Sequence, residues 1–220
     1  MKILVVDTET TGLDPAKGAE CVEVAAALYS VPYRAVLQTV GFLLPIEDNP
    51  AFHINRIEPR ITQLDQPWRT ALALFSEMAA NADAVMAHNA DFDRKWFGQG
   101  KLPHLHLPWL CSMELDWGKI PGRSLTAVAL ANGVTVTPDA HRAASDVATL
   151  TTILSNRDDL EELIAKAQAP RDHYQALLPY ARRDEAKVLG FRWNPEKRAW
   201  IKALTHDELT ALPFEVTRVA

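Results

Sequence analysis

The first half of the chain alternates short apolar runs with segments of helical periodicity. Apolar, partly β-branched runs predict strands, and they occupy residues 2–6, 21–30, 35–44, 83–88 and 107–115. Apolar residues spaced three and four apart predict helices at residues 64–82, 91–100, 124–133, 139–154 and 158–169. Short links join the first three strands, so we expect them to form an antiparallel meander.

The pattern changes near Pro170. Residues 171–202 hold eight Lys/Arg and four Asp/Glu, whereas residues 1–170 hold 14 basic and 21 acidic side chains. The stretch at 181–202 predicts a helix, Gly190, a strand, an Asn-Pro-Glu-Lys turn and a second strand. We therefore expect a main domain over 1–157, a helical linker over 158–170 and a small basic module over 171–220.

Composition narrows the class of protein. The net charge of −5 over 220 residues argues against a general polyanion-binding coat, which is usually basic. Cys21 and Cys111 have neither disulfide nor metal-site spacing, which favours a reducing compartment. No signal segment and no membrane-length apolar run is found, so we expect a cytoplasmic protein without a membrane partner.

Two acids follow the first apolar run. Asp7 and Glu9 are two positions apart, so on a strand they face the same side. Two carboxylates that close repel each other, and a bound divalent cation removes the repulsion. Hard oxygen ligands select Mg²⁺ or Mn²⁺. An exposed strand end with two solvated acids is the alternative.

Two further polar stretches carry candidate chemistry. In "HNADFD" (88–93), Asn89 can cap a helix and Asp93 can face a cleft, although a helix N-terminus also favours acids for its dipole alone. In "HRAASD" (141–146), His141 and Asp146 would lie about 140° apart on one helix. They converge only if His141 lies at or before the helix start; a plain surface histidine is the alternative.

Together, D-x-E, N-x-x-F-D and H-x-A-x-x-D occur in the order found in the DEDDh (DnaQ-like) family of 3′–5′ exonucleases, which residues 1–157 resemble. "DTETTGL" and "HNADFDRKWF" are most similar to the exonuclease X and polymerase-III proofreading-subunit branch. The resemblance implies an α/β, ribonuclease-H-like fold with a mixed five-stranded sheet flanked by helices. One departure is Asn55-Arg56-Ile57-Glu58, where many relatives have His-Arg/Gly-Ile-Thr; this puts that loop's substrate contacts in doubt.

The resemblance also implies a mechanism. Two Mg²⁺ or Mn²⁺ ions would act on a nucleic acid, with DNA favoured and DNA repair as a context. Asp7 would bridge both ions, Glu9 and Asp146 would complete the first, and Asp93 would help to hold the second. His141 would take a proton from the attacking water, and nucleoside 5′-monophosphates would leave from the 3′ end.

Family positions around the first turn imply contacts to the substrate terminus. The matching residues are Thr8, Thr10, Gly12, Leu13 and Asn89. Thr8 would act through its main-chain N–H, because its side chain points away from Asp7. Leu13 would wedge against the last base, and a plain core leucine is the alternative.

The C-terminal stretch resembles a small domain of unknown function that occurs beside nucleic-acid enzymes. The matching pattern is A-K-x-L-G-x-R-W-x-P-x-x-K-x-W. We hypothesise an accessory nucleic-acid-binding module in which basic side chains meet phosphates and Trp193 or Trp200 stacks on a base. For both tryptophans we favour a core role. The basic residues are Arg182, Arg183, Lys187, Arg192, Lys197, Arg198 and Lys202.

Other functions stay open at this point. An RNA-trimming ribonuclease would share the same acids and histidine. A non-catalytic scaffold that holds a polymerase has no need for five matched groups, and a D-x-D phosphatase leaves Asp93, Asp146 and His141 unexplained. Nucleic acid is the expected partner, and the sequence also allows a homodimer.

Overall fold

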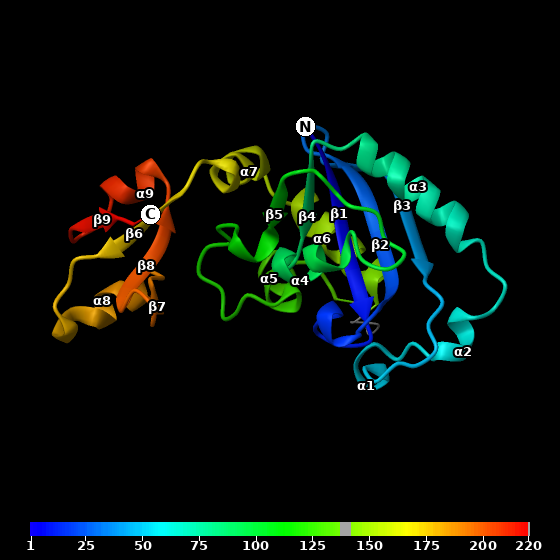
Figure 1. Cartoon of the computed structure of the whole chain (residues 1–220). Helices are drawn as coiled ribbons and strands as arrows, with labels where there is room; N and C mark the ends of the chain where they lie inside the picture. The colour runs from blue at the N-terminus through cyan, green and yellow to red at the C-terminus, as the bar shows by residue number, and fades with distance from the viewer. Residues whose placement is uncertain (137–141, 220) are drawn as a thin grey trace. The chain divides into compact units, whose positions relative to one another are not determined.

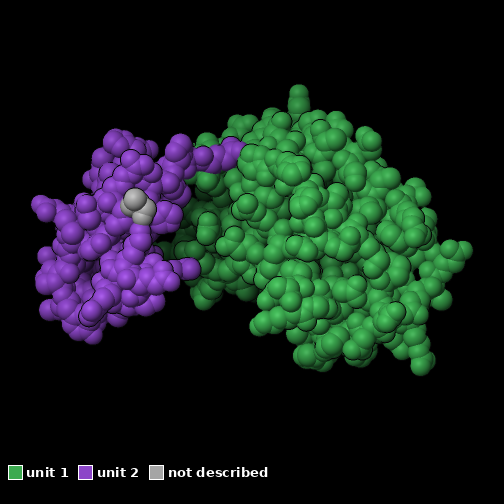
Figure 2. Space-filling view, viewed as in Figure 1, with its two compact units in different colours: residues 1–167 green, residues 168–220 purple. Residues whose placement is uncertain are grey.

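The chain forms two compact units, residues 1–167 and 168–220 (Figure 2). The computed structural model shown in Figure 1 describes residues 1–136 and 142–219. Each unit has its own sheet and its own apolar core. The second unit begins two residues before Pro170, near the position where the charge pattern changes.

The first unit is built on a mixed five-stranded sheet with the order β3-β2-β1-β4-β5. β1, β2 and β3 pair antiparallel, and β4 and β5 add to β1 in parallel. The antiparallel meander and the mixed sheet predicted from the sequence are confirmed. The strands are β1 (Lys2–Thr10), β2 (Cys21–Ser30), β3 (Ala35–Leu43), β4 (Ala84–Ala87) and β5 (Trp109–Cys111).

Helices flank this sheet, and most of them match the predicted segments approximately. The long ones are α3 (Trp68–Ala80) and α6 (Ala143–Ser155). Ser124 caps helix α5, which begins at Leu125, by accepting a hydrogen bond from the Ala127 N–H, as its position predicted. The shorter helices are α1 (Phe52–Asn55), α2 (Pro59–Thr62), α4 (Ala90–Asp93), α5 (Leu125–Ala131) and α7 (Leu160–Gln168).

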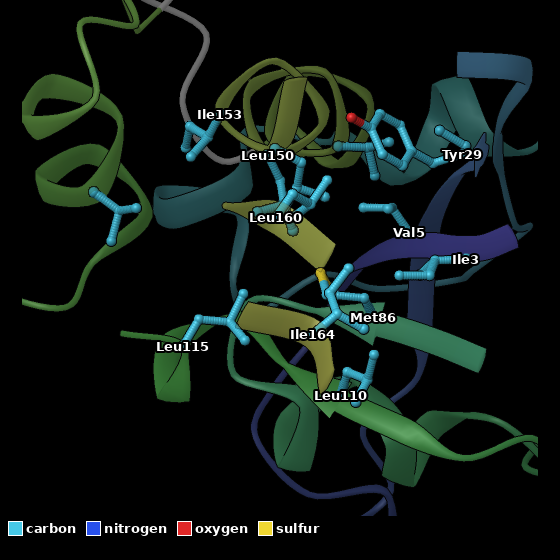
Figure 3. Packing of buried hydrophobic residues seen from close by; sticks show 14 of the residues in the cluster. Ile3, Val5, Tyr29, Met86, Leu110, Leu115, Leu150, Ile153, Leu160 and Ile164 are labelled. Carbon is cyan, nitrogen blue, oxygen red and sulfur yellow. The ribbon is translucent and has the colours of Figure 1, made fainter. Parts of the chain in front are cut away.

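Strand β1 is buried on both faces, and its alternation divides the core in two. Ile3 and Val5 point toward α6, where they pack with Leu150 and Ile153 (Figure 3). The even-numbered side chains, such as Leu4, point to the opposite cluster around α3. Because successive strand residues face opposite sides, the odd-numbered acids further along β1 continue the face that α6 covers.

Two local predictions need correction, and two short helices were not predicted. β1 continues to Thr10 instead of ending at Val6, because residues 7–10 keep pairing with β2. The helix predicted over 91–100 is one α-helical turn, α4, followed by a 3-10 turn at Arg94–Trp96. The helices α1 and α2 were not predicted, since four-residue segments show no periodicity.

The second unit is a small α+β module, as predicted. Its four-stranded sheet has the order β7-β8-β6-β9, so β7 is an edge strand. Its core combines Ala176, Ala186, Phe191 and Leu204. The elements are β6 (Asp172–Ala176), α8 (Arg183–Val188), β7 (Arg192–Asn194), β8 (Ala199–Leu204), α9 (His206–Thr210) and β9 (Val216–Arg218).

In the described parts of the chain, no helix is both long enough and apolar enough to span a membrane. Cys21 and Cys111 are free thiols. The cytoplasmic location and the homodimer expected from the sequence stay predictions.

Candidate active site

Asp7 and Glu9 lie on the part of β1 that extends beyond its fully buried residues. Both side chains are partly buried and face the side of the sheet that α6 covers. In the antiparallel register, Asp7 pairs with Ala25 and Glu9 pairs with Glu23. The pairing shifts by one residue directly after Glu9, as at a β-bulge. Both carboxylates therefore project from a part of β1 that is hydrogen-bonded to β2, and this pairing restricts the backbone at both residues.

Helix α6 brings a third carboxylate to this pair. Its buried residues Val147, Leu150 and Ile153 pack in the core cluster that includes Ile3 and Val5, and this packing sets the helix against the sheet. Asp146 lies in the first turn of α6. Among the described residues, one ligand atom each from Asp7, Glu9 and Asp146 lie within 4.8 Å of one another. Residues far apart in the sequence therefore converge.

Asp93 is the fourth predicted acid, and the structure buries it at the end of α4 with 2% of its surface exposed. Its Oδ1 accepts hydrogen bonds from the Thr8 N–H at 3.0 Å and from the Thr8 hydroxyl at 2.8 Å. Asp93 is not part of the group of three carboxylates. It is nevertheless close enough that its charge acts on Asp7.

Burial and mutual repulsion raise the pKa values of these acids. Burial raises the pKa of Asp7 well above its usual value, and the charges of Asp93, Asp146 and Glu9 add to the effect. Burial, and then the charge of Glu23, raises the pKa of Glu9 to about 8. Burial also raises the pKa of Asp93 to about 7, against the opposing effect of the hydrogen bonds from Thr8.

These residues fit divalent cations. The donors are all carboxylate oxygens, the ligands that Mg²⁺ and Mn²⁺ prefer. Without a cation, crowded carboxylates retain protons near neutral pH. A bound cation can displace these protons and offset the repulsion between the carboxylates. Asp7, Glu9 and Asp146 would hold one ion, with Asp93 available beside Asp7 for another.

We predict that the metal-free protein loses stability as pH rises from about 4.5 to 8. The pKa of Glu9 is raised from 4.5 to about 8 in the folded chain, so folding favours its protonated form. The unfolded chain releases this proton first, and the free energy of unfolding therefore falls across that window. Thermal melts in EDTA should show a lower Tm at pH 8 than at pH 5.5.

Two comparisons attribute this change to the site. Mn²⁺ should raise the Tm more at pH 8 than at pH 5.5, because cations compete with protons for the same oxygens. The variant Asp7→Asn should lose part of the EDTA pH dependence, whereas Asp65→Asn, an exposed acid outside the site, should keep it. A metal-free Tm that rises toward pH 8 in the same way in all three proteins would contradict the prediction.

Two predicted substrate positions, Gly12 and Leu13, lie in the turn after β1, and Thr10 is the last residue of the strand. The Thr10 hydroxyl donates to the Gly12 carbonyl at 2.6 Å. Leu13 is 77% exposed, so it is not a core leucine. Lys95 donates to the Leu13 carbonyl at 2.9 Å, which ties the turn to the segment after α4. Gly12 and Leu13 border an open hollow of about 610 Å³.

The remaining predicted substrate positions are Thr8 and Asn89. The Thr8 N–H, expected to meet substrate, donates to Asp93. Asn89 adopts a left-handed backbone (φ 74°) and makes no side-chain cap hydrogen bond to α4, contrary to the capping role predicted for it. Its geometry shapes the turn between β4 and α4 instead.

Asn55, part of the sequence departure, braces the turn after β1. Its side chain is 2% exposed and donates to the Thr10 carbonyl at 3.1 Å. Its Oδ1 accepts from Asn49 and from the Ile57 N–H. Arg56 next to it takes a left-handed backbone. This loop therefore supports the turn through a buried amide.

His141 lies outside the described residues. Among the described residues, helix α6 begins at Ala143. The role predicted for His141 stays a prediction.

Sequence reasoning missed Glu23, which holds the start of α6. Its carboxylate is buried and accepts from Arg142 Nε at 3.0 Å, Arg142 Nη2 at 2.8 Å and the Ala143 N–H at 3.1 Å. These bonds anchor the first turn of α6, which carries Asp146. The signal was present: Glu23 is the one charged residue in the apolar run 21–30.

Comparison with known proteins assigns the family. The family model described as Exonuclease matches residues 4–154, which include all four acids. The chain belongs to the DEDDh exonuclease family. This confirms the family resemblance stated from the motifs. Membership of the family places this chain among the nucleases, which are hydrolases. A second family model, a domain of unknown function, matches residues 172–219. No curated protein sequence matches the exonuclease.

Solved structures of exonucleases share the fold. Exonuclease X in complex with 5′ overhanging duplex DNA is 25% identical, covering 70% of this chain and 89% of that chain with a TM-score of 0.53. The nuclease domain of 3′hExo, a DEDDh family member bound to rAMP, is 15% identical, covering 73% and 92% with a TM-score of 0.58. E. coli exonuclease I with a dT13 oligonucleotide is 14% identical, covering 93% and 52% with a TM-score of 0.61. The last two support the fold alone.

Proposed function

We propose that this exonuclease removes nucleotides from the 3′ end of a nucleic acid, with DNA favoured, and releases nucleoside 5′-monophosphates. The convergence of Asp7, Glu9 and Asp146 within 4.8 Å supports this most strongly. Burying several like charges together is costly, and the cost is offset when the site binds cations. Residues 1–157 would carry the activity.

In this proposal two Mg²⁺ or Mn²⁺ ions bind the four acids. Asp7 would contribute to both, Glu9 and Asp146 to the first, and Asp93 to the second. When bound, such ions supply a water of lowered pKa and stabilise the charge on the attacking and leaving oxygens of a phosphodiester. The hydrogen bonds from Thr8 orient the Asp93 carboxylate, and Glu23 orients the helix turn that bears Asp146.

His141 is the proposed general base. An imidazole with an ordinary pKa near 6.5 can accept the proton of the attacking water at neutral pH. The water oxygen bonds to phosphorus, and the bond between phosphorus and the 3′-oxygen of the preceding nucleotide breaks. That oxygen takes a proton from solvent, and the terminal nucleotide leaves with a 5′-phosphate.

The turn after β1 is the proposed site for the 3′-terminal nucleotide. The exposure of Leu13 supports its proposed contact with the last base, since an apolar side chain at a site edge can stack against a base. Main-chain groups of Thr8, Thr10 and Gly12 would face the terminal hydroxyl. The Thr8 N–H would have to be shared with Asp93 to do so. Asn89 would act through the turn that it shapes.

The choice of DNA over RNA depends on the likeness to exonuclease X, which is solved with DNA. The 3′hExo structure is bound to rAMP but shares only 15% identity. An RNA-trimming enzyme is therefore the second candidate. A scaffold without catalysis is a weaker one, because it gives no reason for the crowded carboxylates.

A labelled time course tests the proposal. We expect 5′-labelled single-stranded DNA to shorten one nucleotide at a time with Mg²⁺ or Mn²⁺, to stay intact in EDTA, and to shorten again when metal is restored. Matched RNA and duplex substrates rank the polymer and strand preference. Immediate release of the 5′-labelled mononucleotide would mean that digestion starts from the 5′ end. Cleavage without metal would exclude the two-ion mechanism.

A further inference from the structure

The second unit presents a tryptophan on its edge hairpin. Trp193 on β7 pairs across the ladder with Trp200 on β8, with ring centroids 5.6 Å apart at 60°. Trp200 packs against the core of the unit, and the Lys187 ammonium lies 5.5 Å above its ring. Trp193 is 48% exposed. The core role predicted for both tryptophans therefore holds for Trp200 and is wrong for Trp193.

Ion pairs within the unit neutralise much of its basic charge. Arg182 pairs with Glu185 at 2.6 Å, and Lys187 pairs with Asp184 at 2.8 Å. Lys202 donates to the Leu189 carbonyl at 2.9 Å. These three basic residues of the sequence hypothesis are thus engaged inside the unit, and they are poorly available to phosphates.

Arg183 on α8 lies over the Tyr180 ring and donates to the Tyr180 carbonyl at 3.2 Å. The remaining three basic side chains of the hypothesis lie on the hairpin. Arg192 precedes Trp193 on the edge strand, and Lys197 and Arg198 lie in the turn that joins β7 to β8. All three are exposed, and Glu196 is the only acid between Arg192 and Lys202. Arg198 adopts a left-handed backbone (φ 49°) at the tight turn. We define the hairpin surface as Arg192, Trp193, Lys197 and Arg198.

We propose that the hairpin surface binds single-stranded nucleic acid, with a base stacked on Trp193 and phosphates held by Arg192 and Arg198. This inference rests on the proposed function for the choice of polymer and adds a second binding place on the same chain. An exposed aromatic face beside arginines is the arrangement that holds single strands without regard to sequence. Three basic residues against one acid give the surface the charge that complements a phosphate backbone.

The charge distribution along the chain explains why a separate binding place is useful. Residues 1–170 hold 21 acidic and 14 basic side chains, so the nuclease part repels a polyanion outside its metal site. A tethered module that binds the same strand raises the local concentration of that strand. The hairpin surface would therefore strengthen binding of strands long enough to engage both places.

Binding without hydrolysis tests the proposal. The full chain in EDTA is titrated into 5′-labelled dT15 and U15, and anisotropy is followed over a range of salt. Trp193→Ala should weaken binding about 5- to 150-fold, the loss of one stacked base. The double variant R192Q/R198Q should reduce the slope of log K against log salt by about 1.4, for two phosphate contacts. The dT15 and U15 arms give the sugar preference.

Matched controls separate a specific surface from general charge or folding. Arg182→Gln removes one positive charge that is already paired with Glu185, and Tyr33→Ala removes an exposed aromatic ring from the first unit; both should bind like the original chain. Trp193→Phe keeps a stacking ring and should recover most of the affinity, which excludes misfolding as the cause.

Two results would overturn the proposal. One is unchanged affinity and salt slope in Trp193→Ala and R192Q/R198Q. The other is unchanged affinity with loss of a dimer in light scattering, which would make the surface a contact between chains. Because the assay contains no divalent metal, its outcome is independent of whether the nuclease proposal survives the time course above.

Discussion

Replacing Asp7 with Asn is expected to reduce exonuclease turnover at least about 10³-fold. Asp7 lies at the centre of the site: it is one of the three convergent carboxylates, and the charges of the other three acids all act on it. Asn keeps the size but loses the charge that binds a cation. Metal ions contribute several kcal/mol of transition-state stabilisation, and about 4 kcal/mol corresponds to three decades in rate.

The same variant should fold normally. Its metal-free form should melt no lower than the original chain at pH 8, because removing one buried like charge relieves repulsion. Asp91→Asn is the matched control, since Asp91 is an exposed acid two positions before Asp93. Turnover is measured with labelled DNA and Mn²⁺. Normal turnover by Asp7→Asn, or equal loss in Asp91→Asn, would remove the proposed site.

Replacing His141 with Ala is expected to reduce turnover about 10²- to 10⁴-fold, the range for loss of a general base. The rate of the original enzyme should fall below about pH 6.5, where an imidazole becomes protonated, and the variant should lose that limb. Added imidazole should restore part of the activity. His206→Ala, an exposed histidine of the second unit, is the control.

Metal binding separates a base from a ligand. If His141 acts only on the proton, His141→Ala should bind Mn²⁺ with the affinity of the original chain, as measured by calorimetry. A variant that has lost Mn²⁺ would make His141 a ligand, and the assignment would be wrong. A variant with normal turnover would leave the attacking water without an identified base.

The contrast between Asp93 and Glu23 shows which parts of the site are readable from local patterns. Asp93 lies in the helical turn that follows an apolar strand, so its motif indicates a sheet edge. Glu23 sits inside an apolar strand and resembles an isolated polar residue. Only packing against Arg142 and Ala143, about 120 positions away, gives this buried carboxylate its hydrogen bonds.

The second unit makes the same point about charge. Counting Lys and Arg predicted a small basic module with seven candidate phosphate contacts. Neighbours three positions apart on α8 and its preceding turn pair Arg182 with Glu185 and Lys187 with Asp184. The spacing of these residues in the sequence could have predicted both ion pairs. It could not have predicted the exposure of Trp193, because a tryptophan beside a small core can face either the core or the solvent.

The sequence by itself determined the sheet, the order of the motifs, and the face that Asp7 and Glu9 share. Those features depend on short-range periodicity: alternate strand residues point to opposite sides whatever surrounds them. The family resemblance implied that Asp146 meets those two acids, and the tertiary structure brings their ligand atoms within 4.8 Å of one another. The tertiary structure alone decided that Thr8 holds Asp93 and that Glu23 anchors α6. Such contacts depend on how helices pack on the sheet, and packing reflects the fit of whole surfaces rather than the spacing of residues along the chain.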